Sequence, residues 1–568
     1  MVLYRLAFWL CLVFLTSGCA APPSRPDEQA VRPPADAAGS PASSHQPPQF
    51  LEEALGPIPS SHTEPVADAN GWHVACAAHR GTRMHIWRDG DLGPGFAQIL
   101  PESITFSPNG KRLAFVAWEA GRSVVVVDGQ VGTPHDRIMH EPPVFSPDSR
   151  RIAYGARDND KWFALVEGER GQPHDAIIPG TLTFSPDSSR VAYVAIDDSK
   201  CSVVVDGEQG PACDATMRGM PVFSPDSRHI AYAGSENGKW FAVVDGEPGP
   251  RYDAVAQGTP AFSPDSSRAA YVVRQKNKYS VVVDGTRGPA YDTVTVPVFA
   301  PSGHRIAYMA RAGDRYYVMT DGAMSPVYDG VLWDSLTFSA DGHSVAYTAT
   351  RDGRWFVVVN GKPGPACDEV MEGTPVFSPD GRRVAYAAME GGRWRVVLDG
   401  HAQSFHGTVG VRSLIFSPDS RRFAYAGMTE GGRQMVIDGT PGREFDGIAD
   451  LWFSPDSSRA VYLARTVSSW CLVEGEDSGP AFDCGVDVLF SPDSRRVVVV
   501  GLRDGKGVMA IDGHLWPGYD ELVKNGPSFR PDGSLVFLAA RDQHLYRVTV
   551  PASESGKTHP LHPHPHHQ

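Results

Sequence analysis

The chain has 568 residues, with 52 Lys and Arg against 66 Asp and Glu, which gives a formal net charge of −14. The acidic residues are spread along the chain, and nucleic-acid binding needs a basic stripe, so the composition argues against DNA or RNA as a partner. The acidic excess mainly favours solubility.

The N-terminus predicts export. An apolar run from Leu6 to Leu15 follows Arg5. It is too short to span a bilayer, which needs about 20 apolar residues, and its length is typical of a signal peptide. Residues 16–19 read Thr-Ser-Gly-Cys and resemble the lipobox of bacterial lipoproteins. The resemblance implies that Cys19 is lipidated; the alternative is an ordinary cleaved signal peptide with a chance Cys.

We therefore expect residues 1–18 to be a lipoprotein signal peptide and residues 19–55, rich in Pro, Ala and Ser, to be a disordered tether. By resemblance to Gram-negative lipoproteins, Ala20 after the Cys suggests sorting to the outer membrane. The expected location is the cell envelope, with a lipid anchor on the periplasmic side of the outer membrane or at the cell surface.

A repeat of 37 to 39 residues covers most of the chain. Its opening phrase, of the type Pro-Val-Phe-Ser-Pro-Asp, has its Phe at Phe106, Phe145, Phe184, Phe223, Phe262, Phe299, Phe338, Phe377, Phe416, Phe453, Phe490 and Phe529. A period near 40 built from short β-type runs is typical of propeller blades, each a small four-stranded sheet. The fold class predicted is all-β, with about thirteen blades.

Each unit predicts four strands. Pro-Val-Phe-Ser gives the first, the Ser-Pro-Asp turn leads into a second of the type Ile-Ala-Tyr, and residues 240–244 illustrate the third. Asp245-Gly246 then predicts a tight hairpin. We expect the fourth strand to begin near Tyr252-Asp253 and to run to the next Pro-Val-Phe. The recurring Asp of this phrase is interpreted as a turn residue that bonds to backbone.

Both ends of the array bear on closure. A worn thirteenth unit starts at Pro65-Val66-Ala67, and the last unit stops after a strand from Leu545 to Val550. Gly56-Pro57-Ile58 stands where a fourth strand belongs, so the N-terminal segment is expected to complete the C-terminal blade and remove exposed strand edges.

Thirteen blades exceed the usual four to eight per ring. We therefore expect tandem β-propellers of six plus seven blades, over residues 56–305 and 306–552, with the boundary near 300–340, where the motif is worn. A single oversized ring and an open superhelix are the alternatives. Residues 553–568 are a His- and Pro-rich tail, expected to be disordered, for which weak metal binding is one interpretation.

The repeat resembles the TolB-type and WD-repeat-like propeller families. Their aromatic-Ser-Pro-Asp-Gly turn appears as residues 377–381, and the following Ile-Ala-aromatic phrase appears as Val384-Ala385-Tyr386. The resemblance covers about residues 65 to 550 and implies a propeller fold and a setting in envelope assembly or surveillance.

An aromatic residue preceded by Lys or Arg recurs before the third strand, and in a propeller such positions line up on one face. The candidate interaction ring comprises Trp162, Trp240, Tyr279, Tyr316, Trp355 and Trp394. If exposed, these side chains belong to the types enriched at binding hot spots. If buried, they are packing between blades.

Export places the cysteines where disulfides can form. Cys201 and Cys213 flank one Asp-Gly hairpin, and Cys471 and Cys484 flank the corresponding hairpin of a later unit. Each pair is a candidate disulfide, although the two pairs imply different registers. The alternative is that one or both pairs are reduced core residues.

The sequence contains no Gly-x-Ser-x-Gly, His-Glu-x-x-His or phosphate-binding Gly loop, and we predict no catalytic, cofactor-binding or dedicated metal-binding residue. The function expected is that of a non-catalytic envelope lipoprotein whose propeller repeats form a protein-interaction scaffold. The alternatives are a carbohydrate- or small-ligand-binding protein, a polysaccharide lyase with its site in the propeller channel, and a structural spacer.

Overall fold

The computed structural model describes residues 50–552, except 218–220, 404–407, 411, 468, 517–518 and 524–525. The expected signal peptide, Cys19, most of the expected tether and the whole expected tail (553–568) therefore lie outside the described residues. Within them the chain is all-β: apart from one 3-10 helix, η1 (Trp333–Ser335), its regular elements are strands. No helix in the described part is long and apolar enough to cross a membrane.

The strands form thirteen antiparallel sheets, which we number as blades 1–13 in chain order. Four blades have a continuous first strand, and in the other nine this strand is split into two short pieces that pair with the two ends of the second strand. The expectation of an all-β propeller of four-stranded blades is confirmed.

The first strands of blades 1–13 are β2 (Val66–Ala67), β6 (Gln98–Phe106), β10 (Arg137–Ile138) with β11 (Val144–Phe145), β15 (Ala176–Ile177) with β16 (Thr183–Phe184), β20 (Ala215–Thr216) with β21 (Val222–Phe223), β25 (Ala254–Val255) with β26 (Ala261–Phe262), β30 (Thr293–Val294) with β31 (Val298–Phe299), β35 (Gly330–Val331) with β36 (Thr337–Phe338), β40 (Glu369–Val370) with β41 (Val376–Phe377), β45 (Thr408–Val409) with β46 (Ile415–Phe416), β50 (Gly447–Phe453), β54 (Cys484–Phe490), and β58 (Glu521–Leu522) with β59 (Ser528–Phe529).

The second strands, in the same order, are β3 (Val74–Arg80), β7 (Leu113–Glu119), β12 (Ile152–Asp158), β17 (Val191–Asp197), β22 (Ile230–Glu236), β27 (Ala269–Gln275), β32 (Ile306–Ala312), β37 (Val345–Arg351), β42 (Val384–Glu390), β47 (Phe423–Met428), β51 (Ala460–Thr466), β55 (Val497–Arg503) and β60 (Leu535–Arg541). The third strands are β4 (Arg83–Arg88), β8 (Arg122–Val127), β13 (Lys161–Val166), β18 (Lys200–Val205), β23 (Lys239–Val244), β28 (Lys278–Val283), β33 (Arg315–Thr320), β38 (Arg354–Val359), β43 (Arg393–Leu398), β48 (Arg433–Ile437), β52 (Ser469–Glu474), β56 (Lys506–Ile511) and β61 (His544–Val550).

The fourth strands are β5 (Asp91–Phe96), β9 (Gln130–Val131), β14 (Glu169–Arg170), β19 (Glu208–Gln209), β24 (Glu247–Pro248), β29 (Thr286–Arg287), β34 (Ala323–Met324), β39 (Lys362–Pro363), β44 (His401–Ala402), β49 (Thr440–Phe445), β53 (Asp477–Phe482), β57 (His514–Leu515) and, completing blade 13, β1 (Leu51–Pro57).

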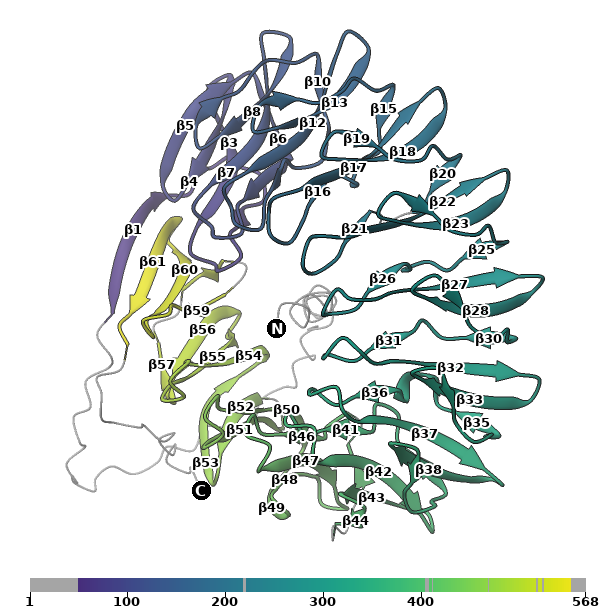
Figure 1. Ribbon diagram of the computed structural model, residues 1–568. Helices are drawn as coiled ribbons and strands as arrows, with labels where there is room; N and C mark the ends of the chain where they lie inside the picture. Colours follow the sequence, from purple (N-terminus) through teal and green to yellow (C-terminus); the bar gives the residue numbers. More distant parts are fainter. Residues whose placement is uncertain are drawn as a thin grey trace, which may run out of the picture.

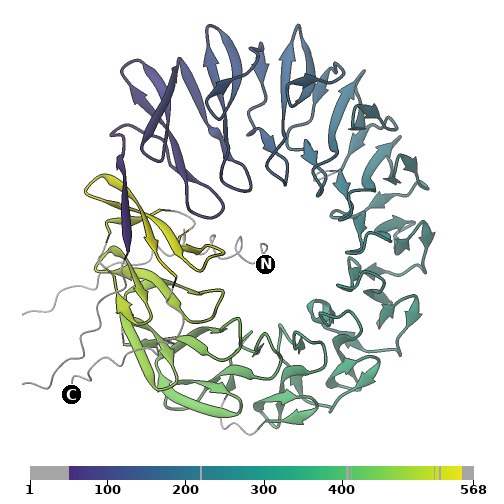
Figure 2. The same ribbon diagram turned by 60° about the vertical axis from the view of Figure 1, so that its left-hand side comes forward.

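The blades follow one another around a single ring (Figures 1 and 2). This corrects the expected division into rings of six and seven blades. The apolar contacts continue through the expected boundary, because Ala300 and Ala307 of blade 7 share a cluster with Phe338 and Val345 of blade 8. The worn motif at this point keeps the same packing as its neighbours, so it marks no break between domains.

The fourth strand is also placed differently from the expectation. The turn Asp245-Gly246 has both residues at positive φ, 51° and 83°, which is the backbone of a two-residue hairpin. The fourth strand, β24, follows at once, and Gly249 and Pro250 end its regular pairing. Ala254–Val255, which we expected within that strand, begins the next blade because it pairs with β27.

The Ser-Pro-Asp turns join each blade to the next. The Ser146 hydroxyl donates to the Asp148 carboxylate (2.6 Å), and the Asp148 amide donates to the Ser188 hydroxyl of the following blade (2.9 Å). The Arg151 guanidinium donates to the Ser188 carbonyl (2.9 Å) and lies 5.2 Å from the centre of the Phe184 ring. Similar contacts recur around the ring, and we call such an interface a regular junction.

The core lies between the faces of neighbouring blades. In one cluster, Val203 of blade 4 packs against Tyr232 and Phe241 of blade 5. The Tyr232 ring fits because the residue that faces its hydroxyl is Gly210: a Cβ there would lie 2.8 Å from the hydroxyl oxygen and 3.1 Å from the Val203 carbonyl oxygen. This close approach explains the Gly of the repeated Gly-Pro phrase.

The ring closes where the N-terminal strand β1 completes blade 13 and where blade 13 meets blade 1, and we call these contacts together the closing junction. β1 pairs antiparallel with β61, so the expectation that the N-terminal segment completes the last blade is confirmed. Residues 51–55, which we expected to belong to the disordered tether, are part of this strand because their backbone pairs with β61. Glu52 accepts a hydrogen bond from the Tyr519 hydroxyl (2.6 Å) and pairs with Arg541 (3.0 Å). Burial raises the pKa of Glu52, but these two partners outweigh it and hold that pKa below its usual value.

Contacts across the closing junction are specific to it. The Trp72 indole donates to the Ser528 hydroxyl (2.7 Å), and Arg530 lies 5.1 Å from the centre of the Trp72 ring. Arg547 pairs with Asp89 (3.5 Å). In the core, Trp87 and Cys76 share a cluster with Leu538 and Leu545.

Candidate functional site

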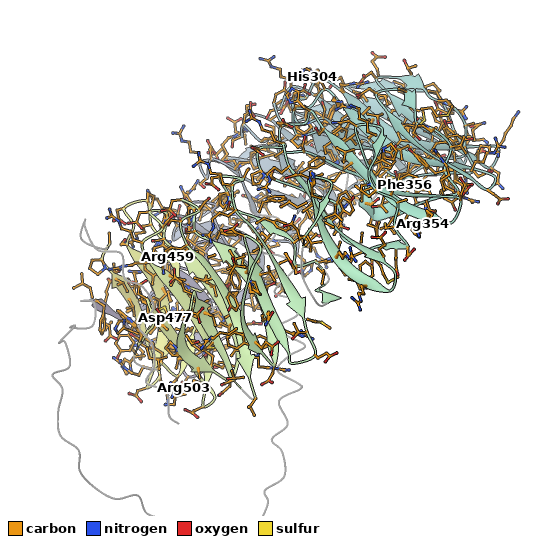
Figure 3. The ribbon with its side chains drawn as sticks, turned by 90° about the horizontal axis from the view of Figure 1, so that it is seen from below. His304, Arg354, Phe356, Arg459, Asp477 and Arg503 are labelled. Carbon is orange, nitrogen blue, oxygen red and sulfur yellow. The ribbon has the colours of Figure 1, made fainter. Side chains whose placement is uncertain are left out.

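The two ends of the strands form two different rims. The turn rim carries the Ser-Pro-Asp and Asp-Gly turns, and the hairpin rim carries the hairpins between second and third strands. In Figure 1 the turns after β16, β21, β26, β31 and β36 point toward the middle of the ring, and the hairpins of the same blades point outward. In Figure 3, Arg459 of the turn rim and Arg503 of the hairpin rim lie at opposite ends of the strands.

All six residues of the candidate interaction ring lie at the hairpin rim, as the second residue of a third strand, and all six are half-buried. Each packs at the interface with the next blade: Trp162, for example, contacts the cluster of Ile177 and Tyr193, and Trp240 contacts that of Val255 and Tyr271. Tyr279, Tyr316, Trp355 and Trp394 occupy equivalent clusters. The six side chains therefore pack between blades, and the part of each that is not buried remains at the rim.

An ion pair stands beside the aromatic residue in several blades. Lys161 pairs with Asp175 (2.5 Å), Lys239 with Asp253 (2.5 Å), and Arg354 with Asp368. The hydrogen bond from Lys161 lowers the pKa of Asp175, and the same bond raises the pKa of Lys161. Both groups are therefore charged at neutral pH and give the rim a regular pattern of paired charges.

The same Asp residues cap hairpins. The second carboxylate oxygen of Asp175 accepts from the Asp198 amide (2.9 Å), and that of Asp253 accepts from the Lys276 amide (2.7 Å), each at the hairpin of the following blade. This confirms the interpretation of the recurring Asp as a residue that bonds to backbone. In each blade where these bonds occur, both oxygens of the carboxylate are already occupied by contacts within the protein.

The structure brings one of the two cysteine pairs together. Cys201 and Cys213 lie directly opposite each other on neighbouring strands of blade 4. Cys471 lies opposite Ala481 in blade 11, whereas Cys484 pairs with Leu502 in the sheet of blade 12. The chain crosses to the next blade between these residues, so the second candidate disulfide is not supported, in line with the different registers that the two pairs imply.

Sequence reasoning did not single out two buried His–Asp pairs at the hairpin rim. His135 lies 3.0 Å from Asp158, and His174 lies 2.7 Å from Asp197 and 3.4 Å from the Tyr193 hydroxyl. Both histidines occupy the repeat position that holds Tyr252 in blade 5, just before the capping Asp, and this shared slot is the signal that could have found them. Their packing follows that of the tyrosines they replace.

Shallow grooves recur between blades on the side of the Asp-Gly turns. One of about 790 Å³ lies between blades 4 and 5 and is lined by Val203, Val205 and Tyr232. Another of about 330 Å³, between blades 8 and 9, is lined by the equivalent Val357, Val359 and Tyr386. The repeat thus produces the same groove more than once. In the described part of the chain, no group of three or more His, Cys, Asp or Glu side chains is placed to hold a metal ion.

Comparison with known proteins gives little that bears on function. No family model matches the chain, and no curated protein matches it. Solved structures that match include a crystal structure of the eukaryotic initiation factor (TM-score 0.29, 15% identity, covering 58% of this chain and 96% of that one) and the structure of the Dos1 propeller (0.27, 10%, 61% and 95%). Dihydro-heme d1 dehydrogenase NirN in complex with DHE also matches (0.25, 16%, 58% and 72%). Similarity at this level supports no inference about this chain.

Proposed function

We propose that this protein is a non-catalytic, lipid-anchored scaffold of the cell envelope, attached through Cys19, and that the hairpin rim of blades 5–9 binds a protein partner. The lipobox-like segment supports the anchor, and the resemblance of the repeat to TolB-type and WD-repeat-like propellers supports the envelope setting. The fold itself supports a scaffold role only in general terms, because propellers serve many functions.

One observation carries the choice of surface. Blades 5–9 present an uninterrupted run of half-buried aromatic residues at the hairpin rim, namely Trp240, Tyr279, Tyr316, Trp355 and Trp394. Trp, Tyr and Arg are the types enriched at binding hot spots. Because packing between blades already fixes these rings, a partner that binds them loses little side-chain entropy. The rim points outward in the blades of this arc and is open to a large partner (Figure 1).

A pull-down after mild crosslinking tests the scaffold and its anchor together. The protein is expressed in the envelope beside Cys19→Ala. We expect a discrete envelope partner with the wild type and a weaker yield when the anchor is removed. Failure to recover any partner from either protein would contradict the scaffold.

A pair of triple variants tests the surface. Lys239→Ala, Lys278→Ala and Arg354→Ala together remove three positive charges from the hairpin rim. The matched control removes three from the turn rim through Arg150→Ala, Arg228→Ala and Arg421→Ala, whose side chains are 87%, 83% and 87% exposed. We expect a several-fold loss of crosslinked partner for the first set only. An equal loss for both sets would place the binding surface elsewhere.

The second candidate is a small-ligand or carbohydrate-binding role for the grooves between blades. The hydroxyls of Tyr232 and Tyr386 are buried at two of these grooves without a hydrogen-bond partner in the described residues. A ligand hydroxyl would supply one once Gly210 or Gly364, which lies against the tyrosine hydroxyl, moves aside. A glycan array probed with the purified full chain tests this role: binding that Tyr232→Phe weakens would favour it over the protein scaffold.

A further inference from the structure

One position of the repeat joins the third and fourth strands by a single pair of residues at the hairpin rim. Most of the blades with an isolated pair here use large side chains: Trp162 and His174, Trp240 and Tyr252, Tyr279 and Tyr291, Tyr316 and Tyr328, and Trp355 and Cys367. In blade 4 the pair is Cys201 and Cys213. Of the isolated pairs in the described residues, it is the one with a cysteine on both strands.

The backbone places this pair within reach of a disulfide. The Cys201 amide donates to the Cys213 carbonyl (2.7 Å), and the Cys213 amide donates to the Cys201 carbonyl (2.8 Å). Residues that exchange both bonds have Cα atoms about 5.5 Å apart and side chains on one face of the sheet. Disulfides span Cα separations of about 4.4 to 6.8 Å. The Cα separation is within this range. The Cβ atoms of a hydrogen-bonded pair lie toward the far end of about 4.5 to 5.5 Å, whereas a disulfide joins Cβ atoms about 3.5 to 4.5 Å apart, so the two strands must approach each other by up to about 1 Å for the sulfurs to meet.

The side chains share one apolar environment. Cys201 and Cys213 are 8% and 1% exposed, and both belong to the cluster of Val203, Tyr232 and Phe241 between blades 4 and 5. The structure holds both residues as free thiols, and the Cys213 thiol donates a hydrogen bond to the Cys201 carbonyl oxygen (3.3 Å). A disulfide at this place would be shielded from reductants in solution.

We propose that Cys201 and Cys213 form a disulfide that clamps the fourth strand of blade 4 to its third strand. Each thiol gives up its proton, one S–S bond forms, and the two electrons reduce the disulfide of an oxidant, either a thiol–disulfide oxidoreductase or oxidised glutathione. The bond takes the place of the aromatic packing that holds this position in the neighbouring blades. The presence of this disulfide in the cell rests on the export proposed above. The opposition of Cys201 and Cys213 in the sheet does not depend on it.

The timing of the reaction follows from burial. Burial raises the pKa of Cys213 to about 11 and also raises the pKa of Cys201. Because the thiolate is the species that attacks a disulfide, both thiols react slowly once blade 5 covers them. We therefore expect the bond to form while the chain folds, and oxidant added to the folded, reduced protein to act slowly.

Peptide mapping tests the proposal. The full chain is refolded from the reduced state in a glutathione redox buffer, unfolded, alkylated without reduction and digested. We expect a crosslinked peptide that contains Cys201 and Cys213, which loses the crosslink after reduction. Both residues recovered as alkylated thiols would overturn the proposal, and this readout needs no variant to fold.

Two variants give a matched comparison. In wild type and in Cys367→Ser, reductant should lower the unfolding midpoint, because the clamp is intact before reduction. In Cys201→Ser with Cys213→Ser, reductant should have no effect on the midpoint. Peptide mapping of protein isolated from cells then distinguishes the disulfide from the proposed export. If the bond forms on refolding but is absent from the protein made in cells, export is contradicted and the ability of the two cysteines to form the disulfide is not.

Discussion

The regular junctions and the closing junction hold the ring by different means. At a regular junction the partners are about 40 residues apart, and the same contacts, such as Arg151 over Phe184, recur from blade to blade. At the closing junction the partners are about 460 to 490 residues apart, as with Trp72 and Ser528 or Glu52 and Arg541, and each contact occurs once. Nearest-neighbour contacts can form progressively along a repeat array. Closure can form only when both ends are in place, so it depends on residues that the repeat does not supply.

The largest effect is expected from removal of the closing strand. Deletion of residues 50–57 takes away β1 and leaves β61 as an unpaired edge. We expect the free energy of unfolding to fall by about 4 kcal/mol or more and the ring to open. Thermal unfolding and small-angle scattering measure the two effects.

The control for this deletion lies in the same strand and in a regular blade. Leu51→Ala changes a residue that is 69% exposed, and Glu247→Ala with Pro248→Ala changes β24 without removing it. Both should shift the unfolding free energy by no more than about 0.5 kcal/mol and leave the scattering curve unchanged. If the deletion behaves like these controls, closure contributes little to the stability of the ring.

A glycine of a regular junction should give the next largest effect. Gly210→Ala places a Cβ 2.8 Å from the Tyr232 hydroxyl, whereas the equivalent Cβ at Gly249 lies 3.4 Å from the Tyr271 hydroxyl. We expect Gly210→Ala to cost about 1 to 3 kcal/mol and Gly249→Ala clearly less, measured by chemical denaturation.

The double variant sharpens this prediction. The Tyr232 hydroxyl has no hydrogen-bond partner in the described residues, so Tyr232→Phe removes the obstructing atom at little cost. Gly210→Ala with Tyr232→Phe should regain part of the lost stability, although the Val203 carbonyl, at 3.1 Å, still crowds the new Cβ. No recovery would mean that the backbone contact alone sets the requirement for glycine.

The turns within each unit could be predicted from the sequence, and the number of blades in the ring could not. The position of the repeated Phe, the Asp-Gly turn and the Asp that bonds to backbone all follow from local chemistry, which is why these expectations were confirmed. The number of blades in one ring depends on the small angle between neighbours, and no single residue specifies it. The worn turn at Ala300-Pro301-Ser302 was misleading for this reason: it changes the motif, but Ala300 stays buried in the contact between blades 7 and 8.

The candidate site also has some features that a single repeat unit determines and others that depend on the next blade. The residue types of the hairpin rim and the opposition of Cys201 and Cys213 follow from strand pairing within one unit. The half-burial of Trp240 depends on Val255 and Tyr271 in the next blade, which a single unit does not contain. Cys471 and Cys484 lie on different sheets because β54, which begins at Cys484, pairs with β55 of the next blade, whereas we expected this stretch to form the fourth strand of the same blade.

A smaller effect, dependent on pH, is expected at the Ser-Pro-Asp turns. The Ser263 hydroxyl is the main cause that lowers the pKa of Asp265 to about 2, whereas an Asp in the unfolded chain titrates near 3.9. A lowered carboxyl pKa contributes stability that is present above about pH 4 and is lost as the pH falls toward 2.

Ser263→Ala tests this contribution. The variant should be less stable than wild type by about 1 kcal/mol near neutral pH, and the part of the difference due to the carboxylate should shrink between about pH 4 and pH 2. Denaturation at a series of pH values measures it. The Arg268 amide also donates to the Ser263 hydroxyl (3.0 Å). If the difference in unfolding free energy between the two proteins stays constant over this pH range, the loss of that hydrogen bond accounts for the whole effect.

The smallest effect is expected in blade 8, whose Asp-Gly turn has Asn in place of Asp. Asn360 accepts from the Val345 amide (3.0 Å) and donates to the Ser344 hydroxyl (3.1 Å), where other blades pair an Arg with an Asp, as Arg383 with Asp399 (2.9 Å). Ser344→Arg together with Asn360→Asp should restore this pair. We expect a gain of about 0.5 kcal/mol that added salt removes, since the pair is near the surface. A gain that persists in salt would have another cause.

The antiparallel pairing of β1 with β61 also determines how the ring responds to force. Six residue pairs join the two strands, from Leu51 opposite Thr549 to Pro57 opposite His544. A pull on the N-terminal side of Phe50, directed along β1, loads these pairs in shear, so they resist together. A pull at right angles opens them one after another, beginning at Leu51. The closing strand is therefore mechanically strong in one direction and weak in the other, and the ring would open most easily to a force that lifts its N-terminal strand sideways.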